Sequence, residues 1–146
     1  AKGPKVAAAE GSDRKAEEAA AAVRSAVQRV HLNQAMTAAL DLVRSVDLYI
    51  EQTQPFRLAK DESKLPEVGT ILYNCAEALR IASVLLWPIL PAKMEQFWGQ
   101  IGCEAYTTAL ADHGAGDFDA WVQWGRLEPG TPVTKAKPLF PRIQSD

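Results

Sequence analysis

The chain of 146 residues has few of the residues that build disulfide frameworks, metal sites or membrane spans. It contains two cysteines and two histidines, and their spacing matches neither a disulfide framework nor a zinc-ligand motif. No stretch approaches 18 uninterrupted apolar residues, and the first residues do not resemble a signal peptide. These absences predict a protein of the reducing cytoplasm, with no membrane as a partner.

The sequence also lacks the short motifs of nucleotide and nucleophilic chemistry. Neither a phosphate-binding Gly-x-x-x-x-Gly-Lys run nor a Gly-x-Gly-x-x-Gly turn occurs. His31 and His113 are isolated, and His31 is interpreted as a surface or capping histidine at a helix junction. Cys75 falls within an apolar stripe, as a small buried residue would, and Cys103 is expected to be an exposed thiol. We therefore predict no catalytic residue and no metal ligand in this chain.

Composition and charge indicate a folded single domain. Apolar residues make up 47% of the chain and charged residues 23%, which excludes a wholly disordered protein. The net charge of −2 argues against a strongly basic surface for nucleic acid, and no DNA partner is expected. A local basic patch remains compatible with this charge.

Apolar residues recur every three or four positions over much of the chain, which predicts an antiparallel helical bundle. An alanine-rich helix is expected to begin at a cap formed by Ser12 or Asp13. The next helix should end near Gln54, because Pro55 disfavours helical geometry in the residue before it. The expected helices cover residues 12–30, 32–54, 65–88 and 91–102, and Leu32, Met36, Ala39, Val43, Val46 and Ile50 form the stripe of the second.

The periodicity weakens after Cys103. A short helical turn is expected at Phe118, Trp121 and Trp124, and a tight turn at residues 128–131. Three prolines then predict an extended tail. Leu139, Phe140 and Ile143 should hold it against the bundle.

We divide the chain into a connector at residues 1–11, a bundle at 12–102 and an irregular, proline-rich extension at 103–146 that packs back on the bundle. Because the first residue is Ala1 and the opening reads like a loop, we expect a piece of a longer protein.

The segment around Pro55 has two interpretations. Phe56 follows the proline directly and is flanked by Arg57 and Lys60. An aromatic ring on a rigid helix end can stack on an unpaired base while nearby cations neutralise phosphates. On spacing alone, however, we favour the alternative that Phe56 plugs the end of the bundle and the two cations are simply solvated.

Several motifs in this chain resemble the anticodon-binding domain of bacterial methionyl-tRNA synthetases, and they follow the family's order over about residues 40–143. They are Tyr49-Ile-Glu-Gln-Thr-x-Pro-Phe-x-Leu-Ala-Lys60, Gly69-Thr-Ile-Leu-Tyr-Asn74, Glu77-Ala-Leu-Arg-Ile81, Leu85-Leu-Trp-Pro-Ile-Leu-Pro91, Leu127-x-Pro-Gly-Thr-x-Val133 and Pro138-Leu-Phe-Pro-Arg-Ile143. Any one motif is weak, but the ordered set is specific.

The resemblance implies a role in an enzyme that attaches methionine to tRNA(Met) with ATP. It implies that Phe56, supported by Pro55, stacks on an anticodon base, and that Asp47, Arg57 and Lys60 lie on the same anticodon-binding surface. The family's catalytic signatures do not occur here. ATP with magnesium, and the family's zinc knuckle, therefore belong to a catalytic part upstream, and no cofactor is expected on these residues.

This chain departs from the family pattern at three points. Phe56 replaces the usual tryptophan, which leaves a smaller stacking face and no indole N–H. Asp47 stands where the family often has asparagine, and a carboxylate repels phosphate. The family's Asn-Leu-x-x-Arg helix would precede Ala1.

Two alternatives stay open at this point. One is the related helical domain of another class I synthetase, which the motif at residues 138–143 disfavours. The other is a free-standing helical adaptor that binds a protein through Trp121, Trp124 and the proline-rich tail.

Overall fold

The computed structural model describes residues 11–29, 31–113 and 118–142. Within these ranges the chain forms helices joined by turns, with no strand, so the predicted all-α fold is confirmed. Most of the predicted connector at residues 1–11 lies outside the described residues, as does Ile143. The elements are α1 (Ser12–Gln28), α2 (Leu32–Thr53), α3 (Pro55–Leu58), the 3-10 turn η1 (Glu62–Lys64), α4 (Leu65–Leu86), α5 (Pro91–Ile101), α6 (Ala105–His113) and α7 (Phe118–Trp121).

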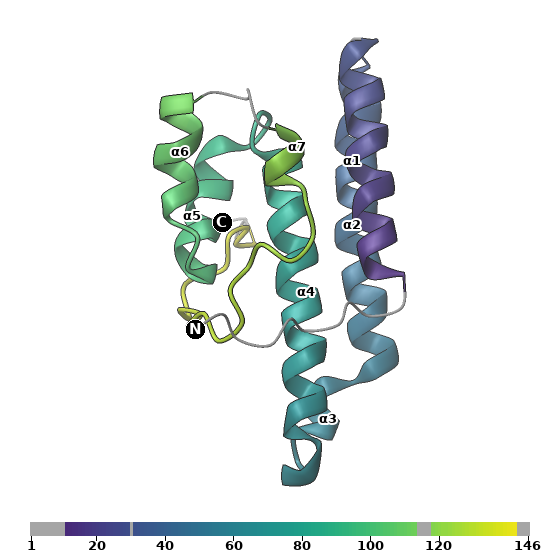
Figure 1. Cartoon of the computed structure of the whole chain (residues 1–146), viewed down its shortest axis with the longest axis vertical. Coiled ribbons are helices and arrows are strands. Elements are labelled where there is room, and N and C mark those ends of the chain that lie inside the picture. Colours follow the sequence, from purple (N-terminus) through teal and green to yellow (C-terminus); the bar gives the residue numbers. More distant parts are fainter. Residues whose placement is uncertain (1–10, 30, 114–117, 143–146) are drawn as a thin grey trace.

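Helices α1, α2 and α4 lie side by side and alternate in direction, with α3 at the end where α2 stops and α4 starts (Figure 1). Helix α4 is the centre of the molecule, because it contacts α1, α2, α3 and α5. Its other side is covered by α5, α6 and the chain that follows α7 (Figure 1).

The helix ends follow the proline and glycine signals closely, with one correction. Helix α2 ends before Pro55, and α5 begins at Pro91 and is closed by Gly102 at a φ of 73°. The predicted cap of α1 by Ser12 or Asp13 is wrong. Gly11 occupies the N-cap position at a φ of 84°, where only glycine is unstrained, and no side chain caps the helix.

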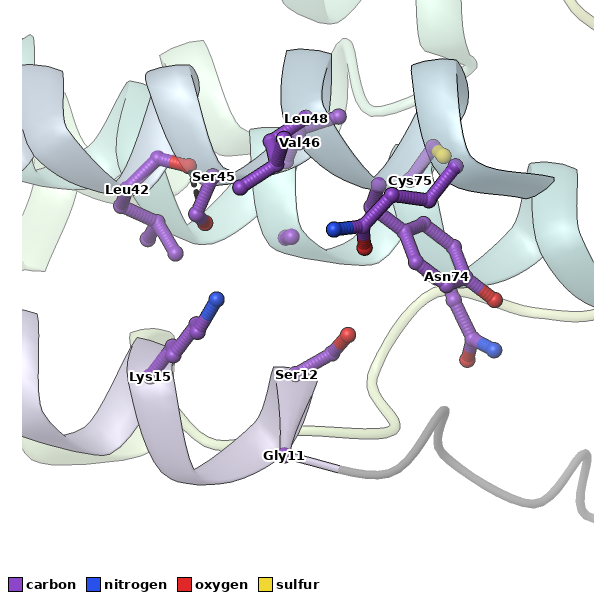
Figure 2. A pocket seen from close by; sticks show the side chains of 12 residues that line it. Gly11, Ser12, Lys15, Leu42, Ser45, Val46, Leu48, Asn74 and Cys75 are labelled. Atoms are coloured by element: carbon purple, nitrogen blue, oxygen red, sulfur yellow. Dashed lines mark hydrogen bonds between the residues drawn. The ribbon is translucent and has the colours of Figure 1, made fainter. Parts of the chain in front are cut away.

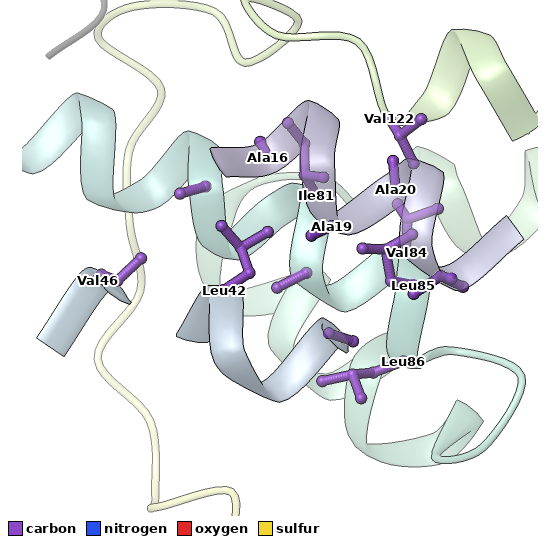
Figure 3. Close-up of a cluster of buried hydrophobic side chains, with 14 of the residues drawn as sticks. Ala16, Ala19, Ala20, Leu42, Val46, Ile81, Val84, Leu85, Leu86 and Val122 are labelled. Atoms are coloured by element: carbon purple, nitrogen blue, oxygen red, sulfur yellow. The ribbon is translucent and has the colours of Figure 1, made fainter. Parts of the chain in front are cut away.

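The core between α1, α2 and α4 is built mainly from small residues of α1 against branched residues of α2 and α4 (Figure 3). Alanines at a helix contact let two backbones approach closely, which explains the alanine-rich composition of α1. The predicted stripe of α2 is only partly right. Leu32 and Met36 are exposed, and the buried positions are Ala35, Ala39, Leu42 and Val46.

Helix α4 is apolar enough to raise the question of a membrane. Residues Glu62–Leu86 reach a mean hydropathy of 1.2 over 18 residues, which by length and composition alone would allow a span. However, 67% of that window is buried inside the bundle, where neighbouring helices cover it on several sides. The apolar sequence of α4 is thus accounted for by its central position.

Beyond Gly102, the sequence analysis did not predict α6, but it did predict the turn at residues 128–131 and the extended tail. The turn at residues 128–131 is closed by a 3.1 Å bond from the Thr131 amide to the Glu128 carbonyl. The tail runs without helix or strand, and the Thr134 amide donates to the Gln100 carbonyl at 2.8 Å. Leu139 is half-buried against the bundle as predicted, but Phe140 is exposed.

Candidate functional site

A tight reversal of the chain positions the candidate residues at the end of α2. We call residues 54–60 the α3 turn. Gln54 ends α2 in the left-handed region, at a φ of 46°, which is uncommon for a side chain larger than glycine's. Its amide donates to the Ile50 carbonyl, and its own carbonyl accepts from the Arg57 and Leu58 amides. One residue thus closes α2 and opens α3.

Pro55 and Phe56 have opposite environments within this turn. Pro55 is buried at the first position of α3, where its fixed φ suits a helix start. Phe56 is 62% exposed, although a phenylalanine usually lies in the core. The interpretation in which Phe56 plugs the end of the bundle is therefore wrong, because its ring faces solvent on a backbone that Pro55 anchors.

The two predicted cations lie beside the ring in the same turn. Arg57 and Lys60 are both exposed, and the Lys60 amide donates to the Arg57 carbonyl at 3.2 Å. Within the part of the chain that the structure describes, neither side chain makes an ion pair, whereas nearby Lys64 is bound to Glu67. Both charges are therefore available to an anionic partner.

Asp47 lies apart from this cluster. It is exposed on α2, about two helical turns before Gln54, which is a rise of roughly 10 Å. The structure thus brings Pro55, Phe56, Arg57 and Lys60 into one turn and leaves Asp47 on the adjoining helix.

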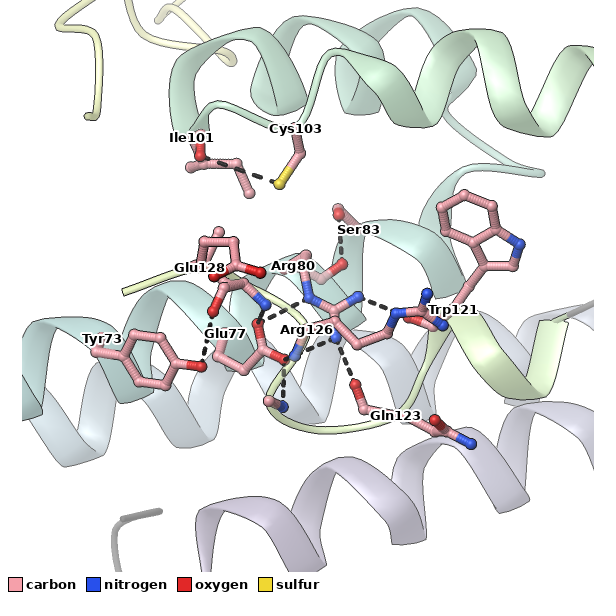
Figure 4. A network of polar contacts seen from close by, with 12 residues as sticks. Tyr73, Glu77, Arg80, Ser83, Ile101, Cys103, Trp121, Gln123, Arg126 and Glu128 are labelled. Carbon is pink, nitrogen blue, oxygen red and sulfur yellow. Dashed lines mark hydrogen bonds and ion pairs between the residues drawn. The ribbon is translucent and has the colours of Figure 1, made fainter. Parts of the chain in front are cut away.

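A second cluster is buried in the middle of α4 (Figure 4). The sequence analysis noted its two charged residues only as part of a family motif, not as a buried pair. Glu77 and Arg80 are both 0% exposed and form two parallel bonds of 2.8 Å. Glu77 also accepts from the amides of Gly125, Arg126 and Leu127 at 2.7–3.1 Å. Arg80 donates to the carbonyls of Trp121 and Gln123 and to the Tyr106 hydroxyl, at 2.6–3.0 Å.

We call this pair and its bonds to residues 121–127 the clamp. A buried ion pair is tolerable only when its remaining polar atoms are also satisfied, and here backbone groups satisfy them. Burial by itself would lower the pKa of Arg80, but its bonds to Glu77 raise that pKa above the ordinary value. One feature of the sequence could have indicated this buried pair: two residues of opposite charge lie three positions apart within an apolar helix.

The thiols and the neighbouring phenols are held in their neutral forms. Burial raises the pKa of Cys75 to about 11, and it also raises the pKa of Cys103. Cys103 is buried, so the prediction of an exposed thiol is wrong; the bend after Gly102 turns it into the core. Burial raises the pKa of Tyr73 and Tyr106 as well. These groups are therefore unreactive at neutral pH.

The tryptophans proposed for a protein-binding adaptor are largely engaged within the chain. Trp121 packs edge-on against Tyr106, with ring centroids 4.6 Å apart, and the Arg126 guanidinium lies over the Trp121 ring. Trp124 is half-buried against the core. This packing disfavours the adaptor alternative. In the described residues, no group of three or more His, Cys, Asp or Glu is close enough to hold a metal ion.

The fold and the site define an all-α bundle domain that exposes an aromatic ring in the α3 turn and has, in its described part, no metal-binding cluster. No protein-family profile matches the chain. The chain is homologous to bacterial methionine–tRNA ligases.

Three of these relatives span a range of bacteria. Identity is 43% over 111 residues with the enzyme of Streptomyces coelicolor, 34% over 121 residues with that of Halalkalibacterium halodurans and 33% over 131 residues with that of Bacillus subtilis. The matches cover 73%, 83% and 90% of this chain but only 20%, 17% and 18% of the relatives. The chain thus spans about one fifth of the length of the relatives it matches.

Proposed function

We propose that this chain is the anticodon-recognition domain of a methionine–tRNA ligase and that the α3 turn is its contact with the RNA. The observation that carries the proposal is the exposed ring of Phe56 on a proline-anchored turn at the end of the bundle. A ring in that position can stack on an unpaired anticodon base, whichever base it is.

Charge supports the same assignment. Arg57 and Lys60 flank the ring without ion-pair partners among the described residues, so each can approach a phosphate beside the stacked base. Asp47, two turns up α2, would repel phosphate and therefore favours an approach of the RNA from the side of Arg57 and Lys60.

The rest of the proposed activity lies outside this chain. As in the enzymes it resembles, the complete protein would attach methionine to tRNA(Met) in the cytoplasm, with ATP and magnesium bound by other residues. The bundle would supply recognition alone, because we find no catalytic constellation on its described residues.

The proposal is tested by Phe56→Ala in the full-length ligase. Loss of stacking, worth about 1–3 kcal/mol, should weaken binding of an anticodon stem-loop about 5- to 150-fold. Charging of tRNA(Met) should fall while methionine-dependent ATP–pyrophosphate exchange stays near normal, since that reaction needs no tRNA. Phe56→Trp should strengthen binding, because indole offers a larger stacking face.

Phe140→Ala is the matched control for stem-loop binding. Phe140 is 63% exposed, almost the same as Phe56, but lies in the tail. Phe140→Ala should therefore leave the affinity for the stem-loop unchanged. Equal effects of the two substitutions, or loss of pyrophosphate exchange in Phe56→Ala, would contradict the proposed role of the α3 turn.

A further inference from the structure

A small polar cavity lies between the start of α1 and the facing sides of α2 and α4 (Figure 2). Its volume is about 90 Å³. That space exceeds what one water molecule needs, but it is too small for a whole nucleotide. The cavity is on the opposite end of α1 from the contact with α7, and none of the residues of the α3 turn lines it.

Asn74 of α4 is the unusual residue of this cavity. It is 1% exposed, and neither its amide nitrogen nor its amide oxygen has a hydrogen-bond partner among the described residues. Burying such a group unpaired costs free energy, because both atoms would be hydrogen-bonded to water in the unfolded chain. An unpaired donor and an unpaired acceptor side by side can be satisfied by water or by a ligand that both accepts and donates.

The start of α1 supplies the positive side of the cavity. The first bond within the helix runs from the Lys15 amide to the Gly11 carbonyl, so helix geometry offers no partner to the amides of Ser12 and Asp13. The Arg14 amide is bound by the Asp13 carboxylate. In Figure 2 the side chains of Ser12 and Lys15 point from α1 toward α2.

Charge selects the class of ligand. Lys15 is the one charged side chain among the described residues that line the cavity, and no acidic side chain lines it. A helix N-terminus with a lysine and a hydroxyl favours an oxyanion. A protonated phosphate also carries an O–H, which can donate to the Asn74 amide oxygen, while its other oxygens accept from the amide nitrogen; sulfate has no such proton.

We propose that this cavity binds a protonated phosphate group, either inorganic phosphate or the end of a phosphomonoester, through Asn74, Ser12, Lys15 and the start of α1. The proposal is independent of the assignment of the α3 turn, which lies on other residues.

The test measures the thermal midpoint of the full chain in phosphate, sulfate and AMP, each against sodium chloride of equal ionic strength. Inorganic phosphate at tenfold its Kd should raise Tm by about 3–5 °C, and sulfate should give less than half that shift. A larger shift with AMP than with phosphate identifies the phosphomonoester as the source, and the reverse order identifies the free ion. No shift with either phosphate compound, or an equal shift with sulfate, overturns the proposal.

Two substitutions locate the effect. Asn74→Leu should abolish the phosphate shift while Tm without phosphate stays the same or rises, because two orphaned polar atoms are removed. Lys15→Gln should weaken phosphate binding about 2- to 5-fold. Arg14→Gln is its control, since it removes the same charge one residue away and outside the cavity. If Asn74→Leu keeps the shift, or Arg14→Gln lowers it as much as Lys15→Gln, the assignment is wrong.

Discussion

The clamp and the α3 turn reverse the usual partition of residues in opposite ways. The clamp buries an acid and a base at 0% exposure, whereas the α3 turn holds a phenylalanine at 62% exposure. Charged groups are almost never fully buried unless paired, and phenylalanine is among the residues most often buried. From this difference we infer that the clamp serves the fold, and the exposure of the α3 turn supports its proposed role in binding a partner.

The two regions also differ in how far their polar groups are bound within the chain. Each atom of the clamp is bound within the chain, so the clamp has nothing left to offer a ligand. In the α3 turn only the backbone is satisfied, while the ring and both cations face solvent. Substitutions in the clamp should therefore change stability, and substitutions in the α3 turn should change binding.

Glu77→Gln should have the largest effect on folding. It leaves Arg80 as an uncompensated buried charge and weakens three amide contacts, which should lower the free energy of unfolding by about 3–5 kcal/mol in urea denaturation. Glu67→Gln breaks the exposed ion pair with Lys64 and should cost at most about 1 kcal/mol. If the two substitutions cost the same, the clamp does not hold residues 121–127.

Gly102→Ala tests the contact between α5 and the tail. Gly102 has a φ of 73°, and an added Cβ would lie 2.4 Å from the Thr131 methyl carbon. We expect a loss of about 1–3 kcal/mol, read from thermal or urea unfolding.

Gly99→Ala, inside α5, is the control for Gly102→Ala at the C-cap of that helix. Nothing lies within 4 Å of its added Cβ, so it should stabilise by about 0.5–1 kcal/mol. Destabilisation by both substitutions to a similar extent would mean that Thr131 does not pack against α5 as described.

Raising the pH should weaken the packing of α4 against α1 and α2, where Cys75 lies. Burial raises the pKa of Cys75 from 9.0 to about 11, so the folded state keeps its proton longer than the unfolded chain does. That contribution is complete below pH 9 and is lost as pH rises through 11, by about 3 kcal/mol at most. Urea unfolding across this range should show the decline, and Cys75→Ala should flatten it. An unchanged slope in Cys75→Ala would assign the decline to other groups, such as Tyr73 or Tyr106.

Phe56→Ala should have the smallest effect on stability. Its exposed ring buries little apolar area, so the loss should stay below about 1 kcal/mol in the same urea assay that measures Glu77→Gln. Combined with the predicted loss of stem-loop binding, this result would separate the two regions. A loss above 2 kcal/mol would make the α3 turn a structural element instead.

Local chemistry explains which parts of the fold could be predicted. Pro55, Pro91 and Gly102 fix helix ends through their own backbone restrictions, so those boundaries are confirmed. The predicted N-cap of α1 was the wrong residue. Gly11, Ser12 and Asp13 all suit an N-cap position, and only the backbone conformation shows that Gly11 occupies it.

The sequence predicted which candidate residues lie close together, but it did not predict the exposure of the Phe56 ring. Pro55, Phe56, Arg57 and Lys60 lie within one turn, so their proximity followed from sequence. Spacing reveals neither the left-handed conformation of Gln54 nor whether the Phe56 ring faces the core or solvent. The clamp was missed because its partners at residues 121–127 are distant in sequence and contribute backbone atoms, which no residue pattern encodes.

The sequence by itself determined the helical class, the principal breaks between helices and the homology to methionine–tRNA ligases, because periodicity, proline geometry and ordered motifs are properties of neighbouring residues. Only the tertiary structure decided which apolar residues are covered, that Glu77 and Arg80 are buried together, and that the Asn74 side chain has no hydrogen-bond partner among the described residues. Burial and hydrogen bonding depend on segments far apart in the chain, and their free energies exist only once those segments have met.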